Sequence, residues 1–324
     1  MKKNVKINGC LYYRNFGEHP PIMELKLSES LLPLVQKEEG VAPLLIELQN
    51  CRKYFDDEYG LIIPKIEVSF NENLQAKEYA FALNAVELER AQVNLQGVDG
   101  VPAEVVIKEY IQKLIRKNIT RILNHRLVIE NINRARDVNP DIVDELLFKH
   151  NFSVAKLKDL LNFLLEENVP LIDMSTILET INDYLQIFSD PRDLLGKVRE
   201  KLSMEILSKC SDKSKVVHGI VLAEDVTELI TKNIVFLSYG KPHIVLEPTE
   251  RRKLMKKISE QAEAFMKKGF YPLVFVCTSP VRQALFSYLD RTFDDYFCIS
   301  DMEILEAGKN YICEKEGEIT FEER

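Results

Sequence analysis

The hydrophobic period of the chain changes repeatedly along its length, and this limits the folds that it can adopt. After Pro20-Pro21 the segment IMELKLSESLLPLV alternates apolar and polar positions, as a half-buried strand does. From Val41 to Tyr59 apolar residues recur at spacings of three and four, which indicates one helix face, and Gly60 follows as a stop. IPKIEVSFN and KEYAFALNAVELERAQV then read as two more strands. We therefore expect an N-terminal extension over residues 1–21 and a β-α-β-β subdomain over residues 22–101.

The middle of the chain has a helical pattern. Gly97, Gly100 and Pro102 interrupt the preceding strands, and residues 102–207 are expected to form a helical subdomain. Four residues are predicted to cap helices with their side chains, and two of them are followed by proline at the first helical position: Asn139, Ser153, Asp173 and Asp190.

The last third alternates short apolar runs with helical patterns. VVHGIVL, HIVLE, PLVFVC and DYFCIS read as strands, and AEDVTELI, residues 249–268 and residues 280–291 read as helices. Strands that alternate with helices imply an α/β layer, here over residues 208–324. The chain as a whole is predicted to be a multidomain α+β protein.

Composition excludes several classes of function. The net charge of -8 argues against a nucleic-acid partner, because binding to phosphates needs a basic surface. No run approaches the roughly 18 to 20 apolar residues that cross a bilayer, and the first residues lack the apolar core of a signal peptide. The six cysteines form no CxxC pair. A cytoplasmic protein is expected.

The sequence offers one candidate for catalysis. Cys277 ends an apolar run and is followed by Thr-Ser-Pro-Val-Arg282, so a thiolate there would lie at a helix N-terminus. A cysteine enzyme that uses Cys277 and Arg282 is the alternative function. The segment lacks the length and the glycines of a phosphatase loop, however, and the favoured interpretation makes Ser279 a helix cap and Cys277 a core residue.

No other motif points to chemistry. The five histidines never stand at metal-binding spacings, so a metal site would have to be assembled from distant positions, and no phosphate-cradling or serine-nucleophile motif is present. We expect no enzyme activity, cofactor or metal. Basic residues follow the helix after Pro102 at Lys113, Arg116, Lys117, Arg121 and Arg126. They indicate either a solvated helix face, which is favoured, or a docking site for an acidic partner or acidic lipids.

Four ordered segments carry a resemblance to a known family. They are residues 30–68, 73–93, 160–185 and 272–304, and LLNFLLEENVPLIDMSTILETINDYL at 160–185 is the strongest of them. Together they resemble the cytosolic half of the export-gate proteins of type III secretion, which comprise the flagellar FlhA proteins and their injectisome counterparts. The membrane half of that family has no counterpart in the chain.

The resemblance implies a non-enzymatic scaffold that forms a homo-oligomeric ring of nine copies and docks export substrates, chaperones or other export-apparatus proteins. It places a subunit interface at Asp173, Ser175, Thr176 and Glu179, where Ile172 and Ser175 replace two family arginines. The family's inserted subdomain is expected to be missing near residues 93–102, which puts chaperone docking in doubt. Movement between subdomains is predicted to hinge at Gly97, Gly100 and Gly240.

Overall fold

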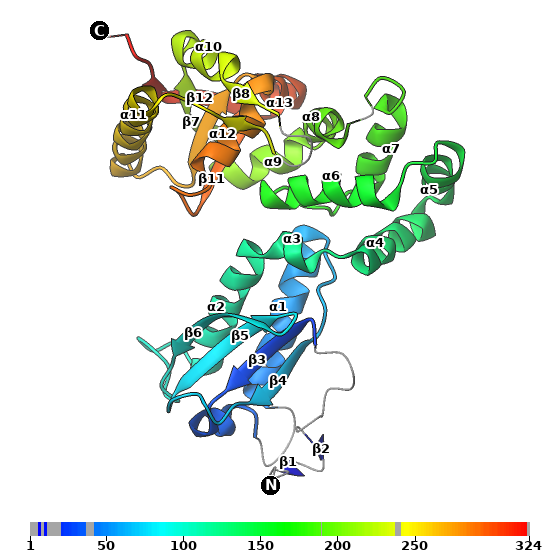
Figure 1. Ribbon diagram of the computed structural model, residues 1–324, viewed down its shortest axis with the longest axis vertical. Coiled ribbons are helices and arrows are strands. Elements are labelled where there is room, and N and C mark those ends of the chain that lie inside the picture. Colours follow the sequence, from blue (N-terminus) through cyan, green and yellow to red (C-terminus); the bar gives the residue numbers. More distant parts are fainter. Residues whose placement is uncertain are drawn as a thin grey trace. The chain divides into compact units, whose positions relative to one another are not determined.

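The computed structural model describes residues 6–7, 10–11, 21–36, 42–188, 190–236 and 241–322 (Figure 1). The chain is a multidomain α+β protein that divides into two compact units, residues 1–133 and residues 134–324. This division falls inside helix α4 (His125–Val138). Of the predicted N-terminal extension, the structure describes Pro21 and a short antiparallel pair, β1 (Lys6–Ile7) and β2 (Cys10–Leu11). The predicted boundaries at 101/102 and 207/208 stay predictions.

The first unit is built on a four-stranded sheet in the order β4-β3-β5-β6. Its strands are β3 (Met23–Leu27), β4 (Ile66–Phe70), β5 (Glu78–Leu83) and β6 (Val86–Gln92). β3 and β4 are parallel and are joined through helix α1 (Pro43–Tyr59), because two parallel strands need a crossover connection. Gly60 ends α1 in the left-handed conformation with φ 64°, as a C-terminal glycine does.

Two strand predictions in this unit are wrong. The segment KEYAFALNAVELERAQV is a hairpin rather than one strand, because Asn84 and Ala85 both have positive φ and turn the chain between β5 and β6. The strand predicted over IMELKLSESLLPLV ends at Leu27, and a 3-10 helix, η1 (Glu29–Leu34), follows it. Pro33 lies in that helix, and proline has no N–H to donate to a sheet.

Helix α2 (Ala103–Lys117) packs against α1 within the first unit. Its apolar residues fall on one buried face, at Ala103, Ile107, Ile111, Leu114 and Ile115. At the edge of this contact, Lys108 Nζ lies 3.1 Å from Glu47 Oε2, and Arg116 Nη2 donates to the Tyr54 hydroxyl over 2.7 Å. A single turn, α3 (Ile119–Ile122), follows.

The second unit begins with a run of helices. After α4 come α5 (Pro140–Asp144), the π-helical turn η2 (Glu145–Lys149), α6 (Val154–Glu166), α7 (Met174–Tyr184), α8 (Pro191–Lys201) and α9 (Ser203–Cys210). The predicted caps at Ser153, Asp173 and Asp190 are confirmed, since each side chain accepts a backbone N–H. Asn139 does stand at the N-cap position of α5 before Pro140, but the side-chain cap bond predicted for it is absent. Its backbone N–H donates to Ala135 O over 2.8 Å and so continues α4, and its side chain makes no cap bond.

A second sheet carries the rest of this unit, in the order β11-β10-β7-β12 with every pair parallel. The strands are β7 (Val216–Leu222), β10 (Leu273–Cys277), β11 (Tyr296–Ser300) and β12 (Ile312–Ile319). Helices α10 (Glu224–Lys232), α11 (Pro248–Lys267) and α12 (Ser279–Leu289) share one apolar core with this sheet. The strand predicted over HIVLE shortens to β9 (His243–Ile244), which pairs only with β8 (Ile234–Val235).

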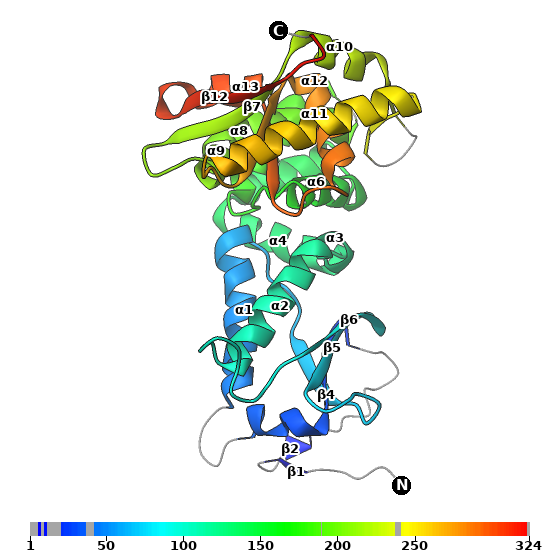
Figure 2. The ribbon, with the colours of Figure 1, turned by 90° about the vertical axis from the view of Figure 1, so that its left-hand side faces the viewer.

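The chain crosses back over the sheet once. From β7 to β10 to β11 it adds neighbours in one direction, and β12 then pairs with the other edge of β7. A right-handed crossover in this reversed direction places its helix on the opposite face of the sheet. That helix, α13 (Asp301–Ala307), contacts α8 and α9 there and is followed by the 3-10 turn η3 (Gly308–Asn310) (Figure 2). The helical run and the sheet are thus packed together within the second unit.

Candidate functional site

The predicted interface residues at the start of α7 have two different structural roles. Asp173 Oδ1 accepts the backbone N–H of Thr176 over 3.0 Å, and Asp173 Oδ2 accepts the Thr176 hydroxyl over 2.6 Å. Both side chains are half-buried and occupied within the chain. An acidic N-cap also complements the positive end of the helix dipole. Asp173 and Thr176 therefore start the helix, and Ser175 and Glu179 face outward beside them.

The exposed face of α7 is the outer surface of the helical run. Glu179 and Asp183 are exposed along it and Ser175 is half-buried, whereas Ile177, Leu178 and Ile181 on the other side are buried. Large apolar side chains stand at both ends, with Ile172 58% and Ile187 69% exposed. We define the α7 surface as Ile172, Ser175, Glu179, Asp183 and Ile187. It combines two apolar ends with an acidic middle, which suits contact with a protein partner.

The end of α7 is tied to the helices beside it. Asn182 donates its side-chain N–H to Ile142 O over 3.1 Å, and Gln186 Nε2 lies 3.3 Å from His150 Nδ1. Close to this contact Phe148 on η2 is 69% exposed, with the Arg136 guanidinium 5.7 Å from its ring centre. The α7 end and η2 thus each carry a large exposed apolar side chain, Ile187 and Phe148.

A buried charge network joins the helical run to the sheet part of the second unit. Arg199 on α8 lies 2.9 Å from Glu167 and 2.6 Å from Glu303, and Arg282 on α12 lies 2.5 Å from Glu167 and 3.5 Å from Glu303. Arg199 also donates to the backbone oxygen of Cys298. All four side chains are at least nine-tenths buried, and their charges balance as two guanidinium and two carboxylate groups.

The network favours the charged form of Glu303 although this carboxylate is buried. Burial by itself would raise the pKa of Glu303, but the guanidinium groups of Arg199 and Arg282 outweigh this and hold the pKa below its usual range. Glu303 also completes a capping box at the start of α13, where it accepts the Ser300 N–H. The same carboxylate therefore serves the ion pairs and the helix start.

The geometry does not favour the alternative cysteine enzyme. Cys277 lies in the core, and burial raises the pKa of its thiol to about 12, so it is protonated at neutral pH. Arg282 points into the charge network and binds Glu167. The predicted cap at Ser279 is wrong by one position. α12 begins at Ser279 itself after Thr278, and the Ser279 N–H donates to Asp301 Oδ1 over 3.0 Å.

The predicted hinge glycines do not share one environment. Gly97 and Gly100 both have positive φ near 80°; Gly97 precedes the turn in which Val98 and Val101 pair, and Gly100 lies within it. A Cβ on Gly97 would lie 1.8 Å from Val101 O, whereas one on Gly100 would meet nothing within 4 Å. Gly240 lies outside the described residues. The hinge role of these glycines stays a prediction.

The basic residues on and after α2 are all exposed, and Arg116 is engaged with Tyr54. Across the parts of the chain that the structure describes, one group of His, Cys, Asp and Glu residues could hold a metal ion: His218, Glu314 and Glu316. Sequence spacing could not find it, because the histidine and the glutamates lie far apart in the chain. None of the helices in the described part is long and apolar enough to span a membrane.

Comparison with known proteins identifies the family. The FlhA flagellar biosynthesis protein of Treponema pallidum is 24% identical over 346 aligned positions, which take in 93% of this chain and 48% of that protein. The chain thus spans about half the length of the curated relatives it matches. Among solved structures, CdsV of Chlamydia pneumoniae, in its complex with CdsO, superposes with a TM-score of 0.79 at 20% identity over 94% of this chain and 99% of that one.

The nonameric EscV cytosolic domain of a type III secretion system superposes with a TM-score of 0.74 at 17% identity, over 95% of this chain and 99% of that one. At such identities the structural matches establish the fold alone. The family match is independent of them and covers residues 17–98 and 87–309. The chain belongs to the FHIPEP family.

Proposed function

We propose that this chain is a docking and scaffold component of a type III protein export apparatus and carries no catalytic activity of its own. The FHIPEP match over most of its length carries this proposal. The fold supports it, since the chain superposes on CdsV, a protein whose solved complex contains CdsO. The protonated, buried Cys277 supports the absence of thiol chemistry. The site of action is the cytosolic side of the apparatus, and the partners are other apparatus proteins or export substrates.

The chain also forms a homo-oligomeric ring in this proposal. EscV, which shares the fold, is nonameric in its solved structure. The α7 surface is the proposed subunit contact, because it contains the two outward-facing members of the predicted interface, Ser175 and Glu179, between exposed Ile172 and Ile187. Asp173 and Thr176 contribute indirectly by fixing the start of the helix.

The connection between β6 and α2 is short in this chain. The family match comes in two parts that overlap at residues 87–98. The alignment to the Treponema protein is longer than the whole chain although it takes in only 93% of it, so part of the relative has no counterpart here. Between β6 and α2 the chain forms only the tight turn around Val98 and Val101. We infer that the family's inserted subdomain is missing at this turn and that docking of chaperones is weakened.

Light scattering over a concentration series tests the ring. The expected result is a mass that rises toward a large closed oligomer in the unmodified chain. Glu179→Arg and Ile187→Asp should return it to monomers. Their matched controls, Glu263→Arg and Met266→Asp at exposed positions of α11, should assemble normally. A strict monomer at every concentration would refute the ring.

Docking is tested separately by binding the purified chain to the export-apparatus proteins of its own organism at low salt. Binding to at least one of them is expected. If the chain does not form the ring, substitutions on the α7 surface should weaken this binding more than substitutions elsewhere. Absence of binding to the whole set would refute the docking role.

A further inference from the structure

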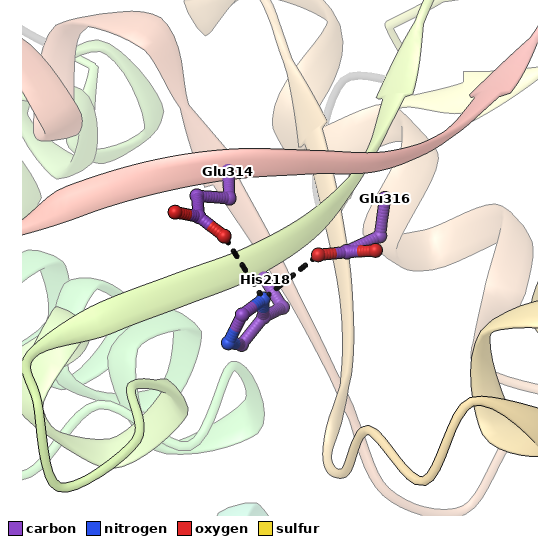
Figure 3. A group of neighbouring side chains, drawn as sticks. All are labelled: His218, Glu314 and Glu316. Carbon is purple, nitrogen blue, oxygen red and sulfur yellow. Dashed lines mark hydrogen bonds and ion pairs between the residues drawn. The ribbon is translucent and has the colours of Figure 1, made fainter.

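Three side chains from neighbouring strands converge at the edge of the second sheet. His218 on β7 is the register partner of Glu314 on β12, and an irregularity between Lys315 and Gly317 adds Glu316 to the edge strand (Figure 3). His218 Nδ1 lies 3.0 Å from Glu316 Oε1 and 3.8 Å from Glu314 Oε2. One ligand atom from each residue lies within 4.8 Å of the others. A bulge in an edge strand commonly re-aims a side chain in this way.

Each part of this cluster is held by a second contact. The other ring nitrogen of His218, Nε2, faces Asp212 Oδ2 at 3.6 Å, and the ring stacks on Phe270 with 4.2 Å between centres. Asp212 is itself fixed by the backbone N–H groups of Val216 and Ser214. Asp212 and Phe270 thus hold the ring with Nδ1 toward the two glutamates, as second contacts orient metal-binding histidines. In the metal-free chain Nδ1 donates to Glu316 Oε1 over 3.0 Å, and a metal ion would replace that proton on binding.

Glu316 is oriented by a cation. Lys268 Nζ binds Glu316 Oε2 at 3.0 Å and Glu316 O at 2.8 Å, so that Oε1 is the oxygen left facing His218. A charged carboxylate with one oxygen already occupied is a ligand that needs little rearrangement on binding.

From this geometry we propose that His218 Nδ1, Glu314 Oε2 and Glu316 Oε1 bind a divalent transition-metal ion. In a tetrahedral zinc site with bonds of about 2.1 Å, ligand atoms lie about 3.4 Å apart. The two distances from Nδ1 bracket this value. One imidazole with two carboxylates suits zinc and its neighbours, whereas calcium requires six or more oxygen ligands. Glu314 is 56% exposed, so the ion has a route from solvent and keeps a position for water.

Such an ion would fasten the edge strand. Among the described strands β12 pairs with β7 alone, and of its two ligands Glu314 precedes the irregular register and Glu316 lies within it. Binding to the folded state alone stabilises that state by mass action. At a free metal concentration about a hundred times the dissociation constant, the Tm of a unit of this size should rise by about 5–10 °C.

The test is titration of the chelator-treated full chain with Zn²⁺ by calorimetry at neutral pH, with Co²⁺ absorption as a second readout. One ion per chain is expected, with affinity lowered at least about tenfold in His218→Asn and in Glu316→Gln, since each removes one of three ligands. The matched control is His243→Asn, an exposed histidine on β9, and it should bind as the unmodified chain does. Circular dichroism in the absence of metal shows whether each variant is folded. Glu314→Gln is used in place of a ligand variant that does not fold.

Three results would overturn the proposal. The unmodified chain could bind no Zn²⁺, the ligand variants could bind as tightly as His243→Asn, or the Co²⁺ complex could show a thiolate charge-transfer band. The last result would assign binding to cysteine, and the first would leave the cluster as an ion pair between His218 and its acidic neighbours.

Discussion

Replacing Arg199 by methionine isolates the contribution of the buried charge network. The guanidinium of Arg199 contacts both carboxylates, and its removal leaves Glu167 and Glu303 to share Arg282. One buried negative charge is then uncompensated. Breaking a buried ion pair from one side costs about 3–5 kcal/mol of folding free energy. For a unit of this size each kcal/mol lowers the Tm by about 2–4 °C, so a fall of about 6–20 °C is expected.

The same two helices supply a matched control. Lys201 on α8 pairs with Glu306 on α13 at 2.6 Å, but both side chains are 45% exposed. Lys201→Met should therefore cost at most about 1 kcal/mol, because exposed ion pairs are screened by water. Thermal unfolding and urea titration of both variants give the comparison. The reasoning is refuted if Arg199→Met is no more destabilising than Lys201→Met.

The effect of Arg199→Met should depend on pH. In the unmodified chain the pKa of Glu303 is lowered on folding, so its contribution is present above the unfolded value of about 4.3 and is lost as the pH falls through the folded value. In the variant the surplus carboxylate has a raised pKa and can take up a proton before the chain unfolds. The difference in stability between the two proteins should thus narrow as the pH is lowered from 7 toward 4. A difference that is constant over this range would assign the effect to packing rather than charge.

Three further predictions concern single positions. Cys277 should resist a thiol reagent at neutral pH in the folded chain and react after denaturation, as peptide mapping would show, because burial raises its pKa to about 12; labelling of the folded chain would revive the enzyme hypothesis. Asp173→Ala should cost about 1 kcal/mol by urea titration through loss of the helix cap, whereas Ser175→Ala should be nearly neutral; equal effects would contradict the division of that motif. Gly97→Ala should destabilise the first unit more than Gly100→Ala, since both are strained by positive φ but only the first would also clash with Val101; the order of their urea midpoints decides this.

Local signals in the sequence predicted many elements of the fold. Ser153, Asp173 and Asp190 were identified as caps because a short polar side chain directly before a helical apolar pattern commonly caps that helix. The hairpin between β5 and β6 was missed because its turn is Asn84-Ala85 rather than Asn-Gly, and alanine rarely takes positive φ. The edge strand β12 was missed because ICEKEGEI is largely charged. Its single buried residue, Ile319, leaves no apolar run to reveal the strand.

The parts of the candidate sites that depend on tertiary contact were beyond sequence analysis. Arg199, Arg282 and Glu303 lie on three different helices and Glu167 directly follows a fourth, α6, and each one alone reads as a solvated surface charge. His218 likewise meets Glu314 and Glu316 only because β12 returns to the β7 edge of the sheet. The crossover through α13 therefore creates both clusters. The hydrophobic periodicity of the sequence does not reveal this crossover.

The charge network also constrains where this protein can bend. Two of its members, Glu167 and Arg199, come from the predicted helical subdomain, and Arg282 and Glu303 come from the predicted α/β subdomain. A hinge motion between these subdomains would pull the ion pairs apart. It would either expose charges that are at least nine-tenths buried or leave them buried without a partner. The predicted boundary at 207/208 lies inside one compact unit, which contains both the α7 surface and the edge strand β12. Because the network joins the helical run to the sheet within this unit, we expect its loss to affect binding at the α7 surface, and this binding can be measured in Arg199→Met.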